Sequence, residues 1–328
     1  MRSLPALTLL LSSLAPMAFA EVPQVVTDIP AVQSLTAQVM GDLGTPVILL
    51  DQGSNAHSYQ LRPSQAKALQ QADLVVWIGP EMTPWLDRAL NGIDGAGGRL
   101  GLLAAEPTLR RDFPMTEDDD HDHAEGDDHD HAGDDDHDHA EDDDHDHDSA
   151  PHSHSGTDPH AWLDPENAKI WLGLIAADLA ALDPEHATSY ERNAEAARVR
   201  IDALETEIAS LLAPVADRPF VVFHQAYGYF TGRFGLNVVG AINLGDATAP
   251  GAAHLTELRN DLAQSGAVCA FPEAVHDPKP AALLIEGTSV RLGGALDPAG
   301  SLLAYGPDLY AALLRGMAAT ISDCLSQG

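Results

Sequence analysis

The chain has 328 residues, enough for two domains of ordinary size, and a formal net charge of −33. Nineteen of its acidic residues fall within Glu117–Asp148, which leaves about −14 for everything else. Nucleic acids and anionic membrane surfaces attract proteins rich in Lys and Arg, so this charge excludes both as partners and favours cations.

The first 20 residues have the pattern of a secretory signal peptide. Arg2 supplies a positive start, an apolar stretch runs over Leu4–Leu14, and Ala18-Phe19-Ala20 is a small-x-small cleavage pattern. We therefore expect an exported mature chain that begins at Glu21. The residue directly after the cleavage point is Glu21 and not a cysteine, and no later stretch approaches ~20 apolar residues, so neither a lipid anchor nor a membrane span is expected.

Short apolar runs alternate with helix-like segments between Val22 and Glu106. The expected strands are QVVTD, PVILLDQ, DLVVWIG and RLGLLAAE, and the expected helices are Ala31–Gly41, Pro63–Gln71 and Pro84–Leu90. Proline suits the first turn of a helix, where its missing N–H has no partner to lose. Strands that alternate with helices predict a parallel, doubly wound sheet.

An acidic, histidine-rich insertion at about 117–155 interrupts this pattern. It lacks the apolar residues needed to offset ordering entropy, so we expect it to be disordered. Order resumes with a helix from Asp164 to about Leu182. Beyond it, a one-sided apolar stripe predicts a helix to about Leu212, roughly 40 Å long; the stripe consists of Ala197, Ile201, Leu204, Ile208 and Leu211.

A second set of strands and helices follows this long helix. The expected strands are PFVVFH, NVVGAI, AVCAF and ALLIEG, and the expected helices are Ala226–Phe234, Ala252–Gln264 and Pro307–Leu325. The predicted fold is α/β, with two doubly wound lobes joined by a long connecting helix. The expected segments are a signal peptide at 1–20, an N-terminal lobe at 21–183, the connecting helix at 184–213 and a C-terminal lobe at 214–328.

Six of the 16 histidines lie outside the insertion, and three of these follow the pattern of a binding site. His57 follows the strand PVILLDQ, His224 ends the strand PFVVFH, and His160 stands just before a helix start. Ligands of open α/β sheets bind beyond the carboxyl ends of the strands, so these three can converge on a cleft between lobes. We give a ligand role a low weight for the other three, which are His186, His254 and His276.

Three neutral imidazoles suit Zn²⁺, which binds nitrogen ligands in tetrahedral geometry. The fourth ligand is water or a carboxylate, for which Asp297 in ALDPAG is the best candidate; capping of a turn is the alternative role of Asp297. The two cysteines, Cys269 and Cys324, have a single possible pairing in an exported chain, and we expect a disulfide; two buried free thiols are the alternative.

Four ordered segments, NAHSYQLRPS, DPHAWLDP, FHQAYGYF and GTSVRLGGALDPAG, resemble the signature segments of a known family. This family comprises the periplasmic zinc-binding, or solute-binding, proteins of high-affinity zinc ABC importers, the ZnuA type of the metal-binding cluster A-I. The similarity spans most of the mature chain. It also extends to a histidine- and acid-rich loop, and to a disulfide between a late strand and the final helix.

The resemblance implies that His57, His160 and His224 are the metal ligands. Manganese-binding members have a carboxylate at the third position, so His224 favours zinc. One departure concerns Ala56, because some zinc-binding members have an acidic fourth ligand there; the fourth ligand therefore stays open between water and Asp297. The resemblance further implies a monomeric periplasmic protein that delivers zinc to an inner-membrane permease.

The insertion repeats His-Asp-His with a period of eight. We predict that it binds zinc at several weaker, less selective sites and passes it to the cleft; a solubilising insertion that binds zinc incidentally is the alternative. The histidines of this accessory metal loop are His121, His123, His129, His131, His137, His139, His145, His147, His152 and His154.

Three other functions are weighed against zinc delivery. A zinc hydrolase also uses three histidines and an open position, but H-E-x-x-H and G-x-S-x-G are absent and no clear general base accompanies the three histidines. A zinc-storage protein would rely on the insertion alone. Transport of manganese, nickel or copper would use similar ligands. Since the chain has no G-x-x-x-x-G-K-[ST] loop, ATP hydrolysis falls to a separate subunit, and we expect no enzyme activity.

Overall fold

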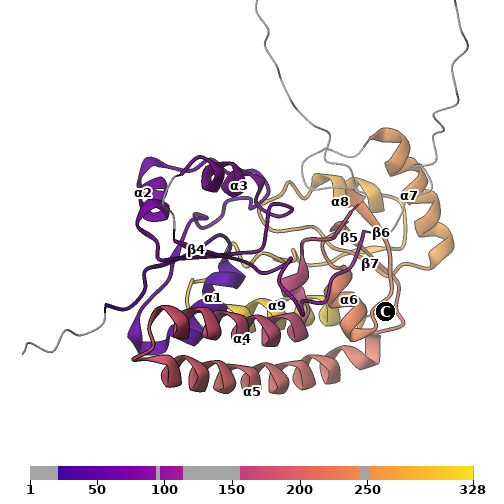
Figure 1. The fold of residues 1–328 in the computed structure, drawn as a ribbon. Coiled ribbons are helices and arrows are strands. Elements are labelled where there is room, and N and C mark those ends of the chain that lie inside the picture. The colour runs from indigo at the N-terminus through magenta and orange to yellow at the C-terminus, as the bar shows by residue number, and fades with distance from the viewer. Residues whose placement is uncertain (1–20, 94–96, 114–155, 244–250, 328) are drawn as a thin grey trace, which may run out of the picture.

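The computed structural model describes residues 21–93, 97–113, 156–243 and 251–327. The predicted signal peptide and the ten histidines of the insertion lie outside these ranges. Two lobes stand side by side above a layer of long helices (Figure 1). The predicted α/β fold with two lobes and a long connecting helix is confirmed.

The N-terminal lobe is a four-stranded parallel sheet in the order β2-β1-β3-β4. The helices α2 and α3 begin at the prolines that predict their starts, and the bounds of all three α-helices lie within one residue of those expected. The elements are β1 (Val25–Thr27), α1 (Pro30–Met40), η1 (Gly41–Leu43), β2 (Val47–Ile48), α2 (Pro63–Gln71), β3 (Leu74–Trp77), α3 (Pro84–Asn91) and β4 (Gly98–Gly101).

The C-terminal lobe repeats this topology, with a parallel sheet in the order β6-β5-β7-β8. In both lobes the first strand along the chain lies between the second and the third, so the crevice beyond its carboxyl end is a topological switch point. The elements are β5 (Phe220–His224), α6 (Gly228–Phe234), β6 (Val238–Asn243), α7 (Ala252–Ser265), β7 (Cys269–Ala270), α8 (Lys279–Ile285), β8 (Arg291–Leu292) and α9 (Leu309–Leu325).

The prediction of a strand at ALLIEG is wrong, because this segment forms most of α8 and the fourth strand is β8. Pro280 lies in the first turn of α8, where proline favours a helix start. Within the helix Ala281 and Leu284 are buried whereas Leu283 is 60% exposed. This spacing of three residues is helical, but a short apolar run does not by itself distinguish a helix from a strand.

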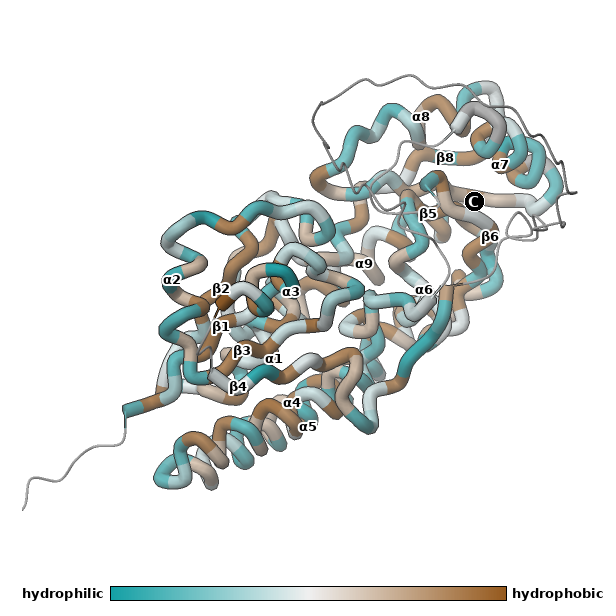
Figure 2. The backbone as a smooth tube through the Cα atoms, turned by 45° about the horizontal axis from the view of Figure 1, so that its top comes forward, coloured by the Kyte–Doolittle hydropathy of each residue, from teal (hydrophilic) through white to brown (hydrophobic). Residues whose placement is uncertain are grey.

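Two long helices form the base beneath both lobes. They are α4 (Pro165–Leu182) and α5 (Ala187–Leu212), preceded by η3 (Ala161–Leu163) and followed by η4 (Ala213–Val215). They run side by side (Figure 1), and α5 alternates between hydrophobic and hydrophilic residues along its length (Figure 2). The predicted stripe on α5 is buried except at its last position, where Leu212 is buried and Leu211 is 41% exposed.

One continuous hydrophobic core connects the lobes with the helical base. It contains Val25 and Leu35 of the first lobe, Ile201 of α5, and Phe271 and Leu314 of the second half of the chain. This largest cluster spans both lobes and the base, and two smaller clusters lie within the individual lobes.

The chain returns to the first lobe just before its last helix. We refer to residues 298–310 as the C-terminal strap. Within it, Ser301 accepts a hydrogen bond from the backbone N–H of Gly53 at 2.9 Å, and the Tyr310 hydroxyl donates to the carbonyl of Trp162 at 2.8 Å. The strap thus connects the C-terminal half to the loop after β2 and to η3.

Cys269 and Cys324 form a disulfide between β7 and α9, as predicted. Both cysteines are buried, and the Arg291 side chain donates a hydrogen bond to the carbonyl of Cys324 at 2.6 Å. Within the described ranges, none of the helices has the length and apolar character that a membrane crossing requires.

Candidate metal site

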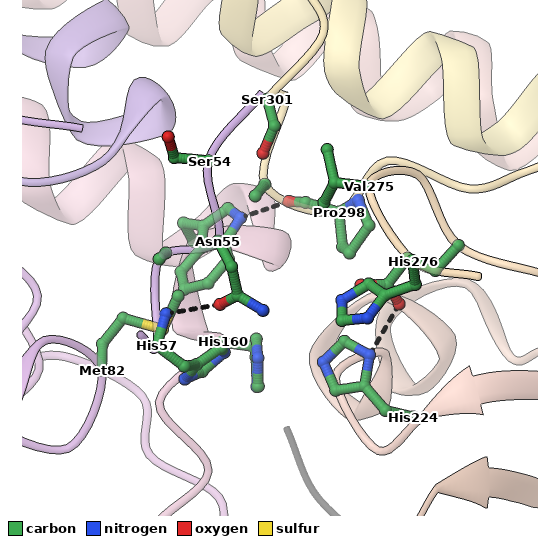
Figure 3. A pocket seen from close by; sticks show the side chains of 14 residues that line it. Ser54, Asn55, His57, Met82, His160, His224, Val275, His276, Pro298 and Ser301 are labelled. Atoms are coloured by element: carbon green, nitrogen blue, oxygen red, sulfur yellow. Dashed lines mark hydrogen bonds and ion pairs between the residues drawn. The ribbon is translucent and has the colours of Figure 1, made fainter. Parts of the chain in front are cut away.

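The three predicted histidines come together between the lobes. One ligand atom from each of His57, His160 and His224 lies within 4.8 Å of the other two. The ring centroid of His160 lies 5.3 Å from that of His57 and 5.3 Å from that of His224. The centroids of His57 and His224 are 6.4 Å apart. Figure 3 shows two of these rings arriving from the first half of the chain and His224 from the opposite lobe.

His57 is fixed by backbone contacts on either side of it. Its own N–H donates to the Asn55 side chain at 2.8 Å, which closes a tight turn. The preceding carbonyl, that of Ala56, accepts a hydrogen bond from the Trp85 indole at 2.7 Å. The loop after β2 therefore holds His57 against the cavity through α3.

A buried carboxylate in turn secures the start of α3. Asp28, the residue after β1, accepts hydrogen bonds from the Ile78 backbone at 2.9 Å and from the Thr83 hydroxyl at 3.4 Å. Burial raises the pKa of Asp28 to about 6, although these donors favour its charged form. Since Thr83 is the N-cap of α3, the Asp28 carboxylate links the carboxyl end of β1 to the helix that contains Trp85.

His160 precedes η3 and is 2% exposed. The Asp158 carboxylate accepts hydrogen bonds from the His160 backbone N–H at 2.9 Å and from its ring Nδ1 at 2.7 Å. A carboxylate accepts from the ring, so Nδ1 carries the proton and Nε2 presents its lone pair. Nε2 is buried and has no hydrogen-bond partner among the described residues, which suits it for a cation.

His224, the last residue of β5, has a similar carboxylate partner. Its Nδ1 lies 2.6 Å from Glu273, which also accepts a hydrogen bond from the Tyr227 hydroxyl at 2.9 Å. Burial, and then the charge of Glu273, raise the pKa of Tyr227 well above its usual value, so the hydroxyl stays a donor. Carboxylates that orient ligand imidazoles in this way also raise their basicity toward a metal.

The structure does not bring Asp297 into this group. Its two carboxylate oxygens each accept a backbone N–H at 2.9 Å, from Ser301 and Leu302. This is the turn-capping role weighed as the alternative from the sequence. A cavity of about 30 Å³ lies between the three histidines and the strap residues Pro298 and Ser301, which leaves room for water as a further ligand.

Sequence reasoning missed the two orienting carboxylates, and it did not anticipate that His276 lines the same cavity. Glu273 follows β7, so the rule that selected His57 and His224 could have found it. Asp158 stands two residues before His160, a spacing typical of a side chain that caps a turn. The other two histidines form hydrogen bonds outside the cavity. Nδ1 of His186 lies 2.7 Å from the Asp183 carboxylate, and Nε2 of His254 lies 3.0 Å from the Ala241 carbonyl.

Asp158→Asn should weaken zinc binding by about 10- to 100-fold, because it removes the charge that orients His160 and enhances its basicity. Asp183→Asn is the matched control, since that buried carboxylate accepts from His186 outside the cavity. We expect the control to leave zinc affinity unaltered in a competition titration with a chelator. Equal affinities for the Asp158→Asn variant and the unmodified protein would contradict the orienting role.

Comparisons with known proteins show the family to which this chain belongs. The profile of the family described as "Zinc-uptake complex component A periplasmic" matches residues 25–324. The "High-affinity zinc uptake system protein ZnuA" of Paracoccus denitrificans (strain Pd 1222) is 56% identical over 306 residues, covering 93% of each chain. The protein of the same name from Brucella suis biovar 1 is 41% identical over 308 residues, covering 92% of each chain.

Solved structures show the same fold at lower identity. The solute-binding protein FpvC from Pseudomonas aeruginosa, in complex with Mn²⁺, has a TM-score of 0.74 at 19% identity, covering 93% of this chain and 99% of that one. A structure described as "Crystal structure of ZnuA" has a TM-score of 0.70 at 22% identity, and the match covers 92% of this chain and 99% of that one. With the profile match and the curated relatives, these likenesses establish that the chain belongs to the family of periplasmic A components of zinc-uptake complexes.

Proposed function

We propose that this protein captures zinc in the periplasm and delivers it to an inner-membrane ABC permease. The observation that carries this proposal is the convergence of His57, His160 and His224 from three distant segments on one cavity. Binding involves no chemical step: the apo protein takes up the ion, docks on the permease and releases it. A separate subunit hydrolyses ATP, and the binding protein acts as a monomer.

Zinc is the ion that this site suits best. Three neutral imidazoles with water in the fourth position match its tetrahedral preference. The two curated relatives are named for zinc uptake, although structural neighbours are described in complex with Mn²⁺ and Ni²⁺. A carboxylate-free ligand set disfavours manganese, which prefers oxygen ligands.

The two carboxylates beside the site support binding rather than hydrolysis. Asp158 and Glu273 each accept a hydrogen bond from a ring Nδ1, at 2.7 and 2.6 Å. A general base must instead contact the water or substrate from which it takes a proton. The oxygens that accept these bonds, Oδ1 of Asp158 and Oε2 of Glu273, are engaged in orienting the imidazoles.

The histidine repeat of 117–155 complements the cleft in this proposal. Each His-Asp-His unit offers nitrogen and oxygen donors, and its carboxylates attract cations. The repeat then collects zinc at several weaker sites and passes it to the three-histidine site. Removal of residues 117–155 should lower both the number of zinc ions bound and uptake under zinc starvation; if neither changes, the collecting role is wrong.

A zinc titration against a competing chelator tests the main proposal. It compares the mature protein, a variant without residues 117–155, and the triple variant His57→Ala, His160→Ala, His224→Ala. The variant without the repeat should keep one tight site, whereas the triple variant should lose it and retain only weak ones. If the triple variant binds zinc as tightly as the mature protein, the repeat is the true site and the protein is a zinc store.

A further inference from the structure

His276 lies on the wall of the zinc cavity but does not belong to the group of three histidines. Its side chain is 22% exposed, compared with 2% for His160 and 7% for His224. The ring centroids of His276 and His224 are 6.4 Å apart, and Figure 3 shows the two rings side by side on the same wall. His276 is therefore more exposed to solvent than His160 and His224, the two buried imidazoles of the cavity.

Glu273 connects these two histidines. One carboxylate oxygen, Oε2, lies 2.6 Å from Nδ1 of His224 and also accepts from Tyr227. The other, Oε1, lies 3.6 Å from Nε2 of His276, which is too long for a hydrogen bond. Two ligands of a tetrahedral zinc ion, each at 2.0–2.1 Å, are about 3.3 Å apart. The Oε1 and Nε2 atoms therefore stand at nearly the separation that one bridging ion requires.

The backbone around His276 is held in an unusual conformation. Val275 has a φ of 62°, a left-handed conformation that β-branched residues rarely adopt. The turn is anchored where the N–H of Ala274 donates to the carbonyl of Leu296 at 2.7 Å, and the His276 ring packs against Phe223 with centroids 4.8 Å apart. Consecutive side chains, Val275 and His276, consequently both line the cavity.

We propose that Nε2 of His276 and Oε1 of Glu273 form a second zinc position, completed by water, on the cavity wall beside His224 of the three-histidine site. One imidazole and one carboxylate bind zinc less tightly than three imidazoles, so an ion there exchanges readily. Because Glu273 also contacts His224, an ion can pass between the two positions without crossing bulk solvent. This inference rests on the proposed zinc-binding function.

Anomalous diffraction from crystals of the mature protein, grown with zinc in increasing molar excess, tests this position. We expect a first peak among His57, His160 and His224, and a second between His276 and Glu273. His276→Phe keeps the ring packing on Phe223 but removes the ligand nitrogen, and should lose the second peak while the first persists. His276→Gln serves the same purpose with a polar side chain, and His254→Phe is the control, which should keep both peaks.

A kinetic measurement extends the test to solution. Loaded with one equivalent of zinc, the His276→Phe and His276→Gln variants should transfer the ion to excess chelator more slowly than the unmodified protein and the His254→Phe control. A single peak at saturating zinc in the unmodified protein, or equal transfer rates in all four proteins, overturns the second position. If the unmodified protein shows no peak among His57, His160 and His224, the zinc-binding function itself is refuted.

Discussion

His160→Ala should reduce the affinity for zinc by about 10²- to 10³-fold. Structural zinc sites in proteins are worth about 10–16 kcal/mol, so each of three or four ligands accounts for about 3–4 kcal/mol, and about 1.4 kcal/mol corresponds to a factor of ten. His160 is the most deeply buried of the three histidines, and its removal also leaves the buried Asp158 without its imidazole partner. Competition with a chelator of known zinc affinity measures the loss.

A control variant distinguishes the loss of a zinc ligand from the general effect of replacing a histidine. His254 bonds the carbonyl of Ala241 and does not line the cavity, so His254→Ala should bind zinc with unaltered affinity. Circular dichroism of each apo protein establishes that the fold is retained. An affinity of His160→Ala within a fewfold of that of His254→Ala would refute His160 as a ligand.

Reduction of the disulfide should lower the free energy of unfolding of the apo protein by about 4 kcal/mol. Cys269 and Cys324 are separated by 55 residues, and closing a loop of this length restricts the unfolded chain by about that amount. Urea unfolding with and without a reductant measures the difference through a shift of the midpoint.

The double variant Cys269→Ala, Cys324→Ala should unfold at the same urea concentration with and without the reductant. Zinc affinity should change little on reduction, since neither Cys269 nor Cys324 lines the zinc cavity. A midpoint of the unmodified protein that does not respond to reduction would show that the bridge does not restrict the unfolded chain.

The helix starts of this protein could be predicted from its sequence because they depend on local chemistry. Pro63, Pro84 and Pro165 each occupy a first helical turn, and Asp164 caps the last of these helices by accepting from the backbone of Glu166. The candidate ligands could be predicted for a similar reason, since parallel strands direct the loops after their carboxyl ends to one edge.

The features that the sequence did not reveal depend on distant partners. The strand order places β1 between β2 and β3, which follows from how the crossover helices pack rather than from any one segment. Two backbone N–H groups within the next five residues donate hydrogen bonds to the Asp297 carboxylate. Both of its oxygens are therefore used in a local turn and not at the metal site. The strap likewise joins Ser301 to Gly53, a pairing across the whole chain that no local pattern encodes.

The shared core of the two lobes has a thermodynamic consequence for the loaded protein. Ligand that binds only the native state stabilises it by RT ln(1 + [L]/Kd), which is about 4 kcal/mol at a zinc concentration 1,000 times Kd. Because buried residues from Val25 to Leu325 belong to one cluster, this energy is not confined to the lobe that contributes a given ligand. Zinc binding should therefore suppress global opening, and the segments that pack in this shared cluster, not only the loops of the cleft, should become more resistant to proteases.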